Sequence, residues 1–140
     1  MRMLSRRVLL VAVAGAALGC GGVFSHDDSG QTQSISLVSS LSPGEVHDRT
    51  LAWFTREGYG LVDLSGRLVR ADKLRPLASG GGQQRDVVTV SVALETGGTR
   101  VTIDLLTYLV ENGEARQAPQ VSAEARSDAN RLAQELQPRP

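Results

Sequence analysis

The sequence predicts an α+β domain in which a four-stranded antiparallel sheet carries two helices on one of its faces. Three observations lead to this prediction. A capped helix begins near Ser42, two hairpin patterns follow within residues 59–105, and an apolar stripe at helical spacing runs from Ala125 to Leu136. The expected order over residues 42–137 is therefore helix, four strands, helix.

The first helix is predicted from its two ends. Ser42-Pro43-Gly44-Glu45 matches a capping box, with Ser42 as the N-cap and Glu45 at the third helical position. Pro43 falls at the first helical position, where its missing N–H costs nothing. Gly58 is expected to end the helix in the left-handed conformation. The face expected to pack on the sheet carries Val46, Thr50, Trp53 and Phe54.

Residues 59–72 read as the first hairpin. A three-residue loop, Leu64-Ser65-Gly66, would place Asp63 opposite Arg67, whereas a two-residue Ser-Gly turn is the rival. Residues 73–86 then read as a loop.

The second hairpin shows the clearest alternation. A two-residue turn at Gly97-Gly98 would pair Leu94 with Val101 and Val92 with Ile103. These apolar pairs share one face of the hairpin, and polar pairs share the other. We therefore expect the hairpin to be buried on one face only.

The final helix is expected to begin after Ser122 and to stop before Pro138. Its apolar stripe could cover the sheet beside the first helix. The stripe consists of Ala125, Ala129, Leu132, Ala133 and Leu136.

The amino terminus has the layout of a secretory signal peptide. Arg2, Arg6 and Arg7 form a basic start, Val8 to Leu18 form an apolar run of eleven residues, and small residues lead to Cys20. A membrane-spanning helix needs about 20 apolar residues, so this run is too short to span.

Ala17-Leu18-Gly19-Cys20 resembles the lipobox of bacterial lipoproteins, although Leu18 stands next to Gly19 and not one place earlier. The resemblance implies a signal peptide over residues 1–19, a diacylglyceryl group on the Cys20 thiol, cleavage before Cys20, and acylation of the new amino group. Cys20 is the sole cysteine, so it can form no intramolecular disulfide. By the same resemblance, the absence of Asp after Cys20 implies the outer membrane facing the periplasm, or the cell membrane where no outer membrane exists.

The export route stays open. Ser5-Arg6-Arg7-Val8-Leu9-Leu10 also resembles the twin-arginine export motif, with Leu in place of Phe and without the final Lys. An ordinary basic start of a general secretory signal is the alternative.

Residues 20–41 are expected to form the lipidated cysteine and a flexible tether. Twenty such residues span about 25 Å, which would lift the domain clear of the headgroups. Ile35-Ser36-Leu37 alternates briefly and could add a short strand. His26-Asp27-Asp28 offers three adjacent metal ligands, but neighbours on a flexible segment rarely converge on one ion.

No arrangement of residues points to catalysis, a cofactor or a metal. Gly80-Gly81-Gly82 lacks the Lys-Ser or Lys-Thr and the helix start that a phosphate loop requires. His47 and Asp48 are helix neighbours, which would point about 100° apart. Without the first seven residues the chain holds 12 basic and 15 acidic residues, a net charge of −3, which argues against nucleic-acid binding.

The sequence therefore predicts a non-enzymatic, lipid-anchored envelope lipoprotein that binds a protein partner or assists envelope assembly. A lipoprotein that captures a small ligand between helices and sheet is the alternative. The candidate docking residues are Ser91, Arg100 and Asp104 on the polar sheet face, for which a solvated face is the simpler explanation.

Overall fold

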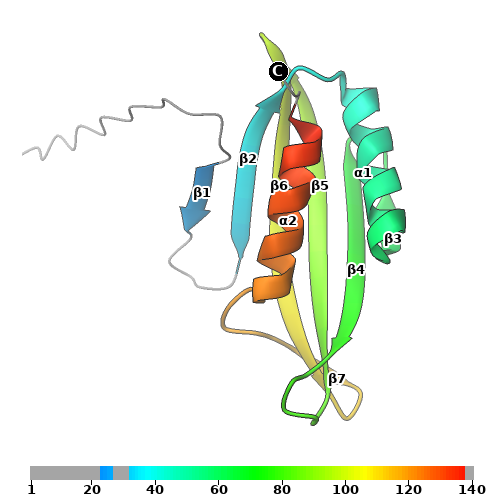
Figure 1. Ribbon diagram of the computed structural model, residues 1–140, viewed down its shortest axis with the longest axis vertical. Helices are drawn as coiled ribbons and strands as arrows, with labels where there is room; N and C mark the ends of the chain where they lie inside the picture. Colours follow the sequence, from blue (N-terminus) through cyan, green and yellow to red (C-terminus); the bar gives the residue numbers. More distant parts are fainter. Residues whose placement is uncertain (1–22, 27–31, 138–140) are drawn as a thin grey trace, which may run out of the picture.

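The fold is that of a computed structural model, which describes residues 23–26 and 32–137. One antiparallel sheet is covered on one face by two helices (Figure 1), as the predicted α+β class requires. The strands are β1 (Val23–His26), β2 (Gln33–Ser39), β3 (Gly60–Leu64), β4 (Leu68–Pro76), β5 (Gln83–Glu95), β6 (Gly98–Glu111) and β7 (Glu114–Gln117), and the helices are α1 (Pro43–Glu57) and α2 (Ala123–Leu136).

The sheet is larger than the predicted four strands. Six strands lie side by side in the order β1-β2-β6-β5-β4-β3, and β7 pairs with the far end of β6. β2 joins the sheet because Ile35 and Leu37 are buried and pair with Ile103 and Val101 of β6. β7 follows a turn at Asn112-Gly113, where both φ angles are positive (51° and 79°).

The predicted tether over residues 20–41 is therefore wrong for β2, and β1 also pairs into the sheet. The alternation at Ile35-Ser36-Leu37, which suggested a short strand, is confirmed, although β2 extends beyond these three residues. The expected signal peptide, Cys20, Asp27 and Asp28 lie outside the described residues, as does Pro138. In the part of the chain that is described, no helix is long and apolar enough to cross a membrane.

Helix α1 confirms the predicted caps. Ser42 Oγ accepts a hydrogen bond from the Glu45 N–H at 3.3 Å, and the Ser42 N–H donates to Glu45 Oε2 at 2.8 Å. Gly58 ends the helix with φ of 80°, and the Tyr59 N–H donates to the Phe54 carbonyl at 2.9 Å. The four residues predicted to pack on the sheet are the buried residues of the helix.

Helix α2 confirms the predicted stripe. Ser122 caps it, because its Oγ accepts from the Ala125 N–H at 3.0 Å. All five predicted residues are buried, together with Asp128. Helix α2 lies over β6, β2 and β5, and α1 lies over β5 and β4, so the core fills the layer between helices and sheet.

The β5–β6 hairpin keeps its predicted faces but not its predicted register. Val92 pairs with Val101, two residues from the predicted partner, because Glu95 pairs with Gly98 across a turn at Thr96 and Gly97. Gly98 instead packs against the end of β2, where a Cβ atom would lie 2.5 Å from the Ser39 carbonyl oxygen. A shift of two residues preserves the faces because side chains alternate with a period of two.

The β3–β4 hairpin follows neither predicted register. Asp63 pairs with Arg70 instead of Arg67, and the Ser65 N–H donates to the Leu68 carbonyl at 2.8 Å to close the turn. A bulge in β3 shifts the pairing between Leu61 and Asp63. The register already differs at the turn, because Leu64 pairs with Val69 across a loop longer than either predicted turn, and the bulge lies farther along β3.

The predicted loop over residues 73–86 is shorter than expected. β4 continues to Pro76 and β5 begins at Gln83, so only residues 77–82 connect the two strands. Asp86, at the end of that predicted loop, consequently belongs to a central strand.

Candidate functional site

The three predicted docking residues share the sheet face that the helices leave open. Ser91 pairs with Thr102, which stands between Arg100 and Asp104 on β6. The structure thus brings the three residues together. Arg100 and Asp104, however, already bind other side chains of the same domain.

Arg100 forms an ion pair with Glu95, and its Nη1 donates to Ser36 Oγ at 3.3 Å. The hydrogen bond from Arg100 lowers the pKa of Glu95. Asp104 accepts a hydrogen bond from Ser34 Oγ. This face is therefore polar and internally paired, which is the behaviour of a solvated sheet surface.

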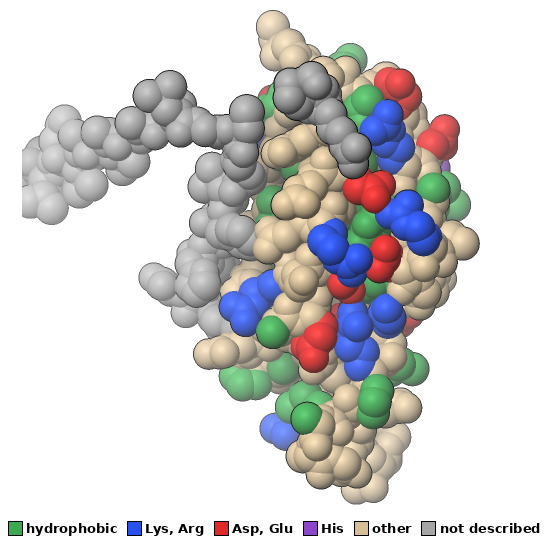
Figure 2. Space-filling view, viewed as in Figure 1, with side chains coloured by type: hydrophobic (Ala, Val, Ile, Leu, Met, Phe, Trp, Pro, Cys, Tyr) green, Lys and Arg blue, Asp and Glu red, His purple; other side chains and the backbone are tan. Residues whose placement is uncertain are grey.

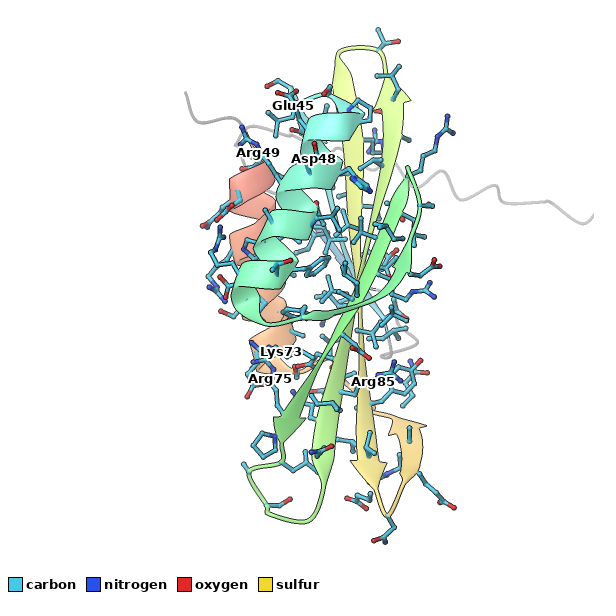
Figure 3. The ribbon with its side chains drawn as sticks, turned by 90° about the vertical axis from the view of Figure 1, so that its right-hand side faces the viewer. Glu45, Asp48, Arg49, Lys73, Arg75 and Arg85 are labelled. Carbon is cyan, nitrogen blue, oxygen red and sulfur yellow. The ribbon has the colours of Figure 1, made fainter. Side chains whose placement is uncertain are left out.

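A second group of polar residues lies beneath the helices and was not predicted. We define the ionic cluster as Tyr59, Arg75, Asp86 and Asp128. Tyr59 follows the C-cap of α1, and the other three lie on β4, β5 and α2. Figure 3 shows Arg75 and Lys73 on the helix side of the sheet, and Arg85 on the opposite side.

Asp86 is fully buried and is the centre of this cluster. Its Oδ1 accepts hydrogen bonds from Thr107 Oγ1 and Ser122 Oγ, each at 2.8 Å. Its Oδ2 accepts from Gln84 Nε2 at 2.9 Å and from Arg75 Nε at 3.0 Å. Four donors from the sheet and the start of α2 therefore converge on one carboxylate.

Asp128 forms the second half of the cluster. Its Oδ2 accepts from Arg75 Nη2 at 2.6 Å and from the Tyr59 hydroxyl at 2.7 Å, and its Oδ1 accepts from Arg131 at 2.6 Å. Burial pushes the pKa of Asp128 upward, but the hydrogen bonds from Tyr59, Arg131 and Arg75 outweigh it, so the pKa is lowered. Burial and the bond to Asp128 raise the pKa of Tyr59, which stays protonated.

The cluster continues outward into the seam between the helices. Lys73 Nζ donates to the Glu57 carbonyl at 2.6 Å and lies over the Tyr59 ring, 5.5 Å from its centroid. Arg131 pairs with Glu57 at 3.1 Å and lies 5.8 Å from the Trp53 ring centroid. Figure 2 shows acidic and basic side chains interspersed over this face.

These contacts give the cluster a structural role. Arg75 bridges two carboxylates, and each carboxylate is held by donors from more than one element, so α2 is tied to β4 and β5. Within the described ranges, the one buried side-chain polar atom without a hydrogen-bond partner is Gln33 Oε1, which does not belong to the cluster. Residues 32–137 contain no group of three His, Cys, Asp or Glu side chains arranged to hold a metal.

His47 and Asp48 differ from the prediction. Helix geometry suggested that they point apart, but His47 Nδ1 lies 3.4 Å from Asp48 Oδ1 because the side chains bend toward each other on the exposed surface of α1. The Asp48 side chain is 84% exposed, so the contact is solvated.

Among the residues whose side chains are described, three of the six exposed large hydrophobic residues lie on the edge strand β3. β3 is the last strand in the sheet order, and its Leu61, Val62 and Leu64 are 50%, 49% and 51% exposed. A hollow of about 360 Å³ lies at the adjoining end of the sheet. It is lined by Pro43, Gly66, Arg67, Val92, Ala93 and Leu94.

No protein-family model matches the chain, and no curated protein matches it. Among solved structures, the chain is similar to a DUF4468 family protein from Bacteroides ovatus, with 11% sequence identity and a TM-score of 0.43. The match covers 80% of this chain and 84% of that one.

Proposed function

We propose that this chain is a non-catalytic lipoprotein of a bacterial envelope, anchored through acyl chains on Cys20, whose domain binds a protein partner. The amino-terminal pattern and the placement of the sole cysteine support the anchor. Two or three acyl chains would hold the protein firmly, because each buried CH₂ contributes about 0.8 kcal/mol. The membrane would be the outer membrane, facing the periplasm, where the organism has one.

The exposed β3 edge is the single observation that carries the partner proposal. An unpaired edge strand offers a row of backbone donors and acceptors to an incoming strand. Leu61, Val62 and Leu64 add apolar side chains to that edge. We infer that the partner adds an extended segment along β3, with apolar side chains and a basic residue opposite Asp63.

The polar face that holds Ser91, Arg100 and Asp104 is the weaker candidate. Its Arg100 and Asp104 already bind groups of the same domain. A partner that used them would have to displace these bonds, whereas the β3 edge needs no such exchange.

Mass spectrometry of the mature amino-terminal peptide tests the anchor. We expect a peptide that begins at Cys20 and carries the mass of two or three acyl chains. A mature terminus at another residue, or an unmodified Cys20, would contradict the proposed localisation.

Crosslinking in intact cells tests the partner. A photoreactive amino acid at Val62 should give a defined adduct that Leu64→Lys abolishes, because the added charge would be desolvated at the strand interface. Leu74→Lys is the matched control, since Leu74 is 56% exposed on β4. If the photoreactive amino acid gives an adduct at position 91 but not at position 62, the docking site is the open sheet face and not the β3 edge.

A further inference from the structure

The first strand of the sheet begins almost immediately after the proposed lipidation site. β1 pairs with β2, with Val23 opposite Ser36, and it ends the sheet at the side opposite β3 (Figure 1). Only three residue steps separate Cys20 from Val23. A chain of that length spans at most about 11 Å, which is far less than the predicted tether.

We propose that the edge formed by β1 and β2 faces a lipid surface and that the β3 edge faces away from it. This orientation rests on the proposed acylation of Cys20. The lipid would be attached within about 11 Å of β1. Five strand spacings of about 4.8 Å place β3 about 24 Å across the sheet from β1.

The distribution of charge favours an upright sheet over one that lies flat. The helix-covered side exposes Arg49, Arg56 and Glu135, and the open sheet face carries Arg70 and Arg85, so contact of either side with lipid would desolvate charged groups. β2 carries no charged side chain over Gln33–Ser39.

Collisional quenching in vesicles tests this orientation. Because acylation uses the sole cysteine, Val38→Cys and Leu64→Cys each introduce one free thiol for a fluorophore. Val38 on β2 and Leu64 on β3 are 50% and 51% exposed, so they form a matched pair. The purified lipoprotein would be reconstituted in phosphatidylcholine vesicles that contain a nitroxide-headgroup lipid, with unlabelled vesicles as the blank.

We expect severalfold stronger quenching at position 38 than at position 64. A spacer of about twelve Gly and Ser residues inserted before Val23 should reduce the signal at position 38, because such a chain spans about 19 Å. The spacer leaves the folded domain unchanged, so it separates membrane distance from folding.

Two kinds of failure are distinguishable. Equal quenching at both positions, or none at either, from a protein whose Cys20 is acylated by mass spectrometry would overturn the orientation alone. An unacylated Cys20 would overturn the anchor and the orientation together.

Discussion

Replacement of Asp86 by alanine tests the structural role of the ionic cluster. The fully buried carboxylate accepts four hydrogen bonds, and its loss would leave Arg75 with one acidic partner in place of two. Removal of one partner of a buried ion pair costs about 3–5 kcal/mol. Small domains unfold with about 5–15 kcal/mol in total, so Asp86→Ala should remove a large share of the stability.

Thermal unfolding followed by circular dichroism is the assay. A loss of 1 kcal/mol lowers the Tm of a domain of this size by about 4–8 °C. We therefore expect the Tm of Asp86→Ala to lie more than about 12 °C below that of the wild type. Asp72→Ala is the matched control. Asp72 pairs with Arg85 at 2.6 Å on the open face, where the side chains are 25% and 38% exposed. Such pairs contribute about 0–1 kcal/mol.

Similar Tm values for the two variants would refute the assignment of Asp86 as the centre of a buried cluster. Thr107→Val gives a milder test if Asp86→Ala does not fold. This substitution removes one donor to Asp86 Oδ1 and the acceptor of the Ser122 N–H, and we expect a loss of about 1–3 kcal/mol.

Three further predictions follow from the packing and the pKa shifts. Leu132→Ala should destabilise the domain by about 2–5 kcal/mol in urea unfolding, because Leu132 is fully buried, whereas Leu94→Ala, at a position 77% exposed, should have little effect. Because the folded pKa of Asp128 is lowered, its contribution to stability is complete above its ordinary value and is lost as the pH falls through the folded pKa. The unfolding free energy of Asp128→Asn should therefore fall less steeply with acid than that of the wild type, and parallel profiles would contradict the assignment. Gly98→Ala should lower the Tm because its Cβ would meet the Ser39 carbonyl, and an equal effect from Gly81→Ala, where the Cβ meets open space, would exclude this clash.

Local signals in the sequence predicted local structure well. The capping box of α1 and the stripe of α2 depend on residues within a few positions of one another, and both are confirmed. The faces of the β5–β6 hairpin are also confirmed, because alternation survives a register error of two residues. The register of this hairpin was predicted wrongly because Gly98 was placed in the turn. Gly98 instead packs closely against the end of β2, and a contact with such a distant segment leaves no local signal.

The ionic cluster depends on contacts between distant segments, which is why it was missed. Arg75, Asp86 and Asp128 come from three different elements. No local pattern in the sequence indicates that these three residues contact one another. Two signals were nevertheless present. Asp86 is in phase with Val88 and Val90, and Asp128 lies within the apolar stripe of α2. A charged residue on a predicted buried face calls for a buried partner.

The placement of β2 has a consequence for the order of folding. Strands β3 to β6 pair with their neighbours in sequence, but β2 pairs with β6. Ser39 therefore lies opposite Thr99, a residue far away in the sequence. The Ser39 hydroxyl also donates to the Leu136 carbonyl at 2.6 Å, which joins β2 to the end of α2. Loop-closure entropy makes such distant contacts late events. The central meander can thus assemble during synthesis, while Ile35 and Leu37 stay uncovered until the carboxyl-terminal helix is complete.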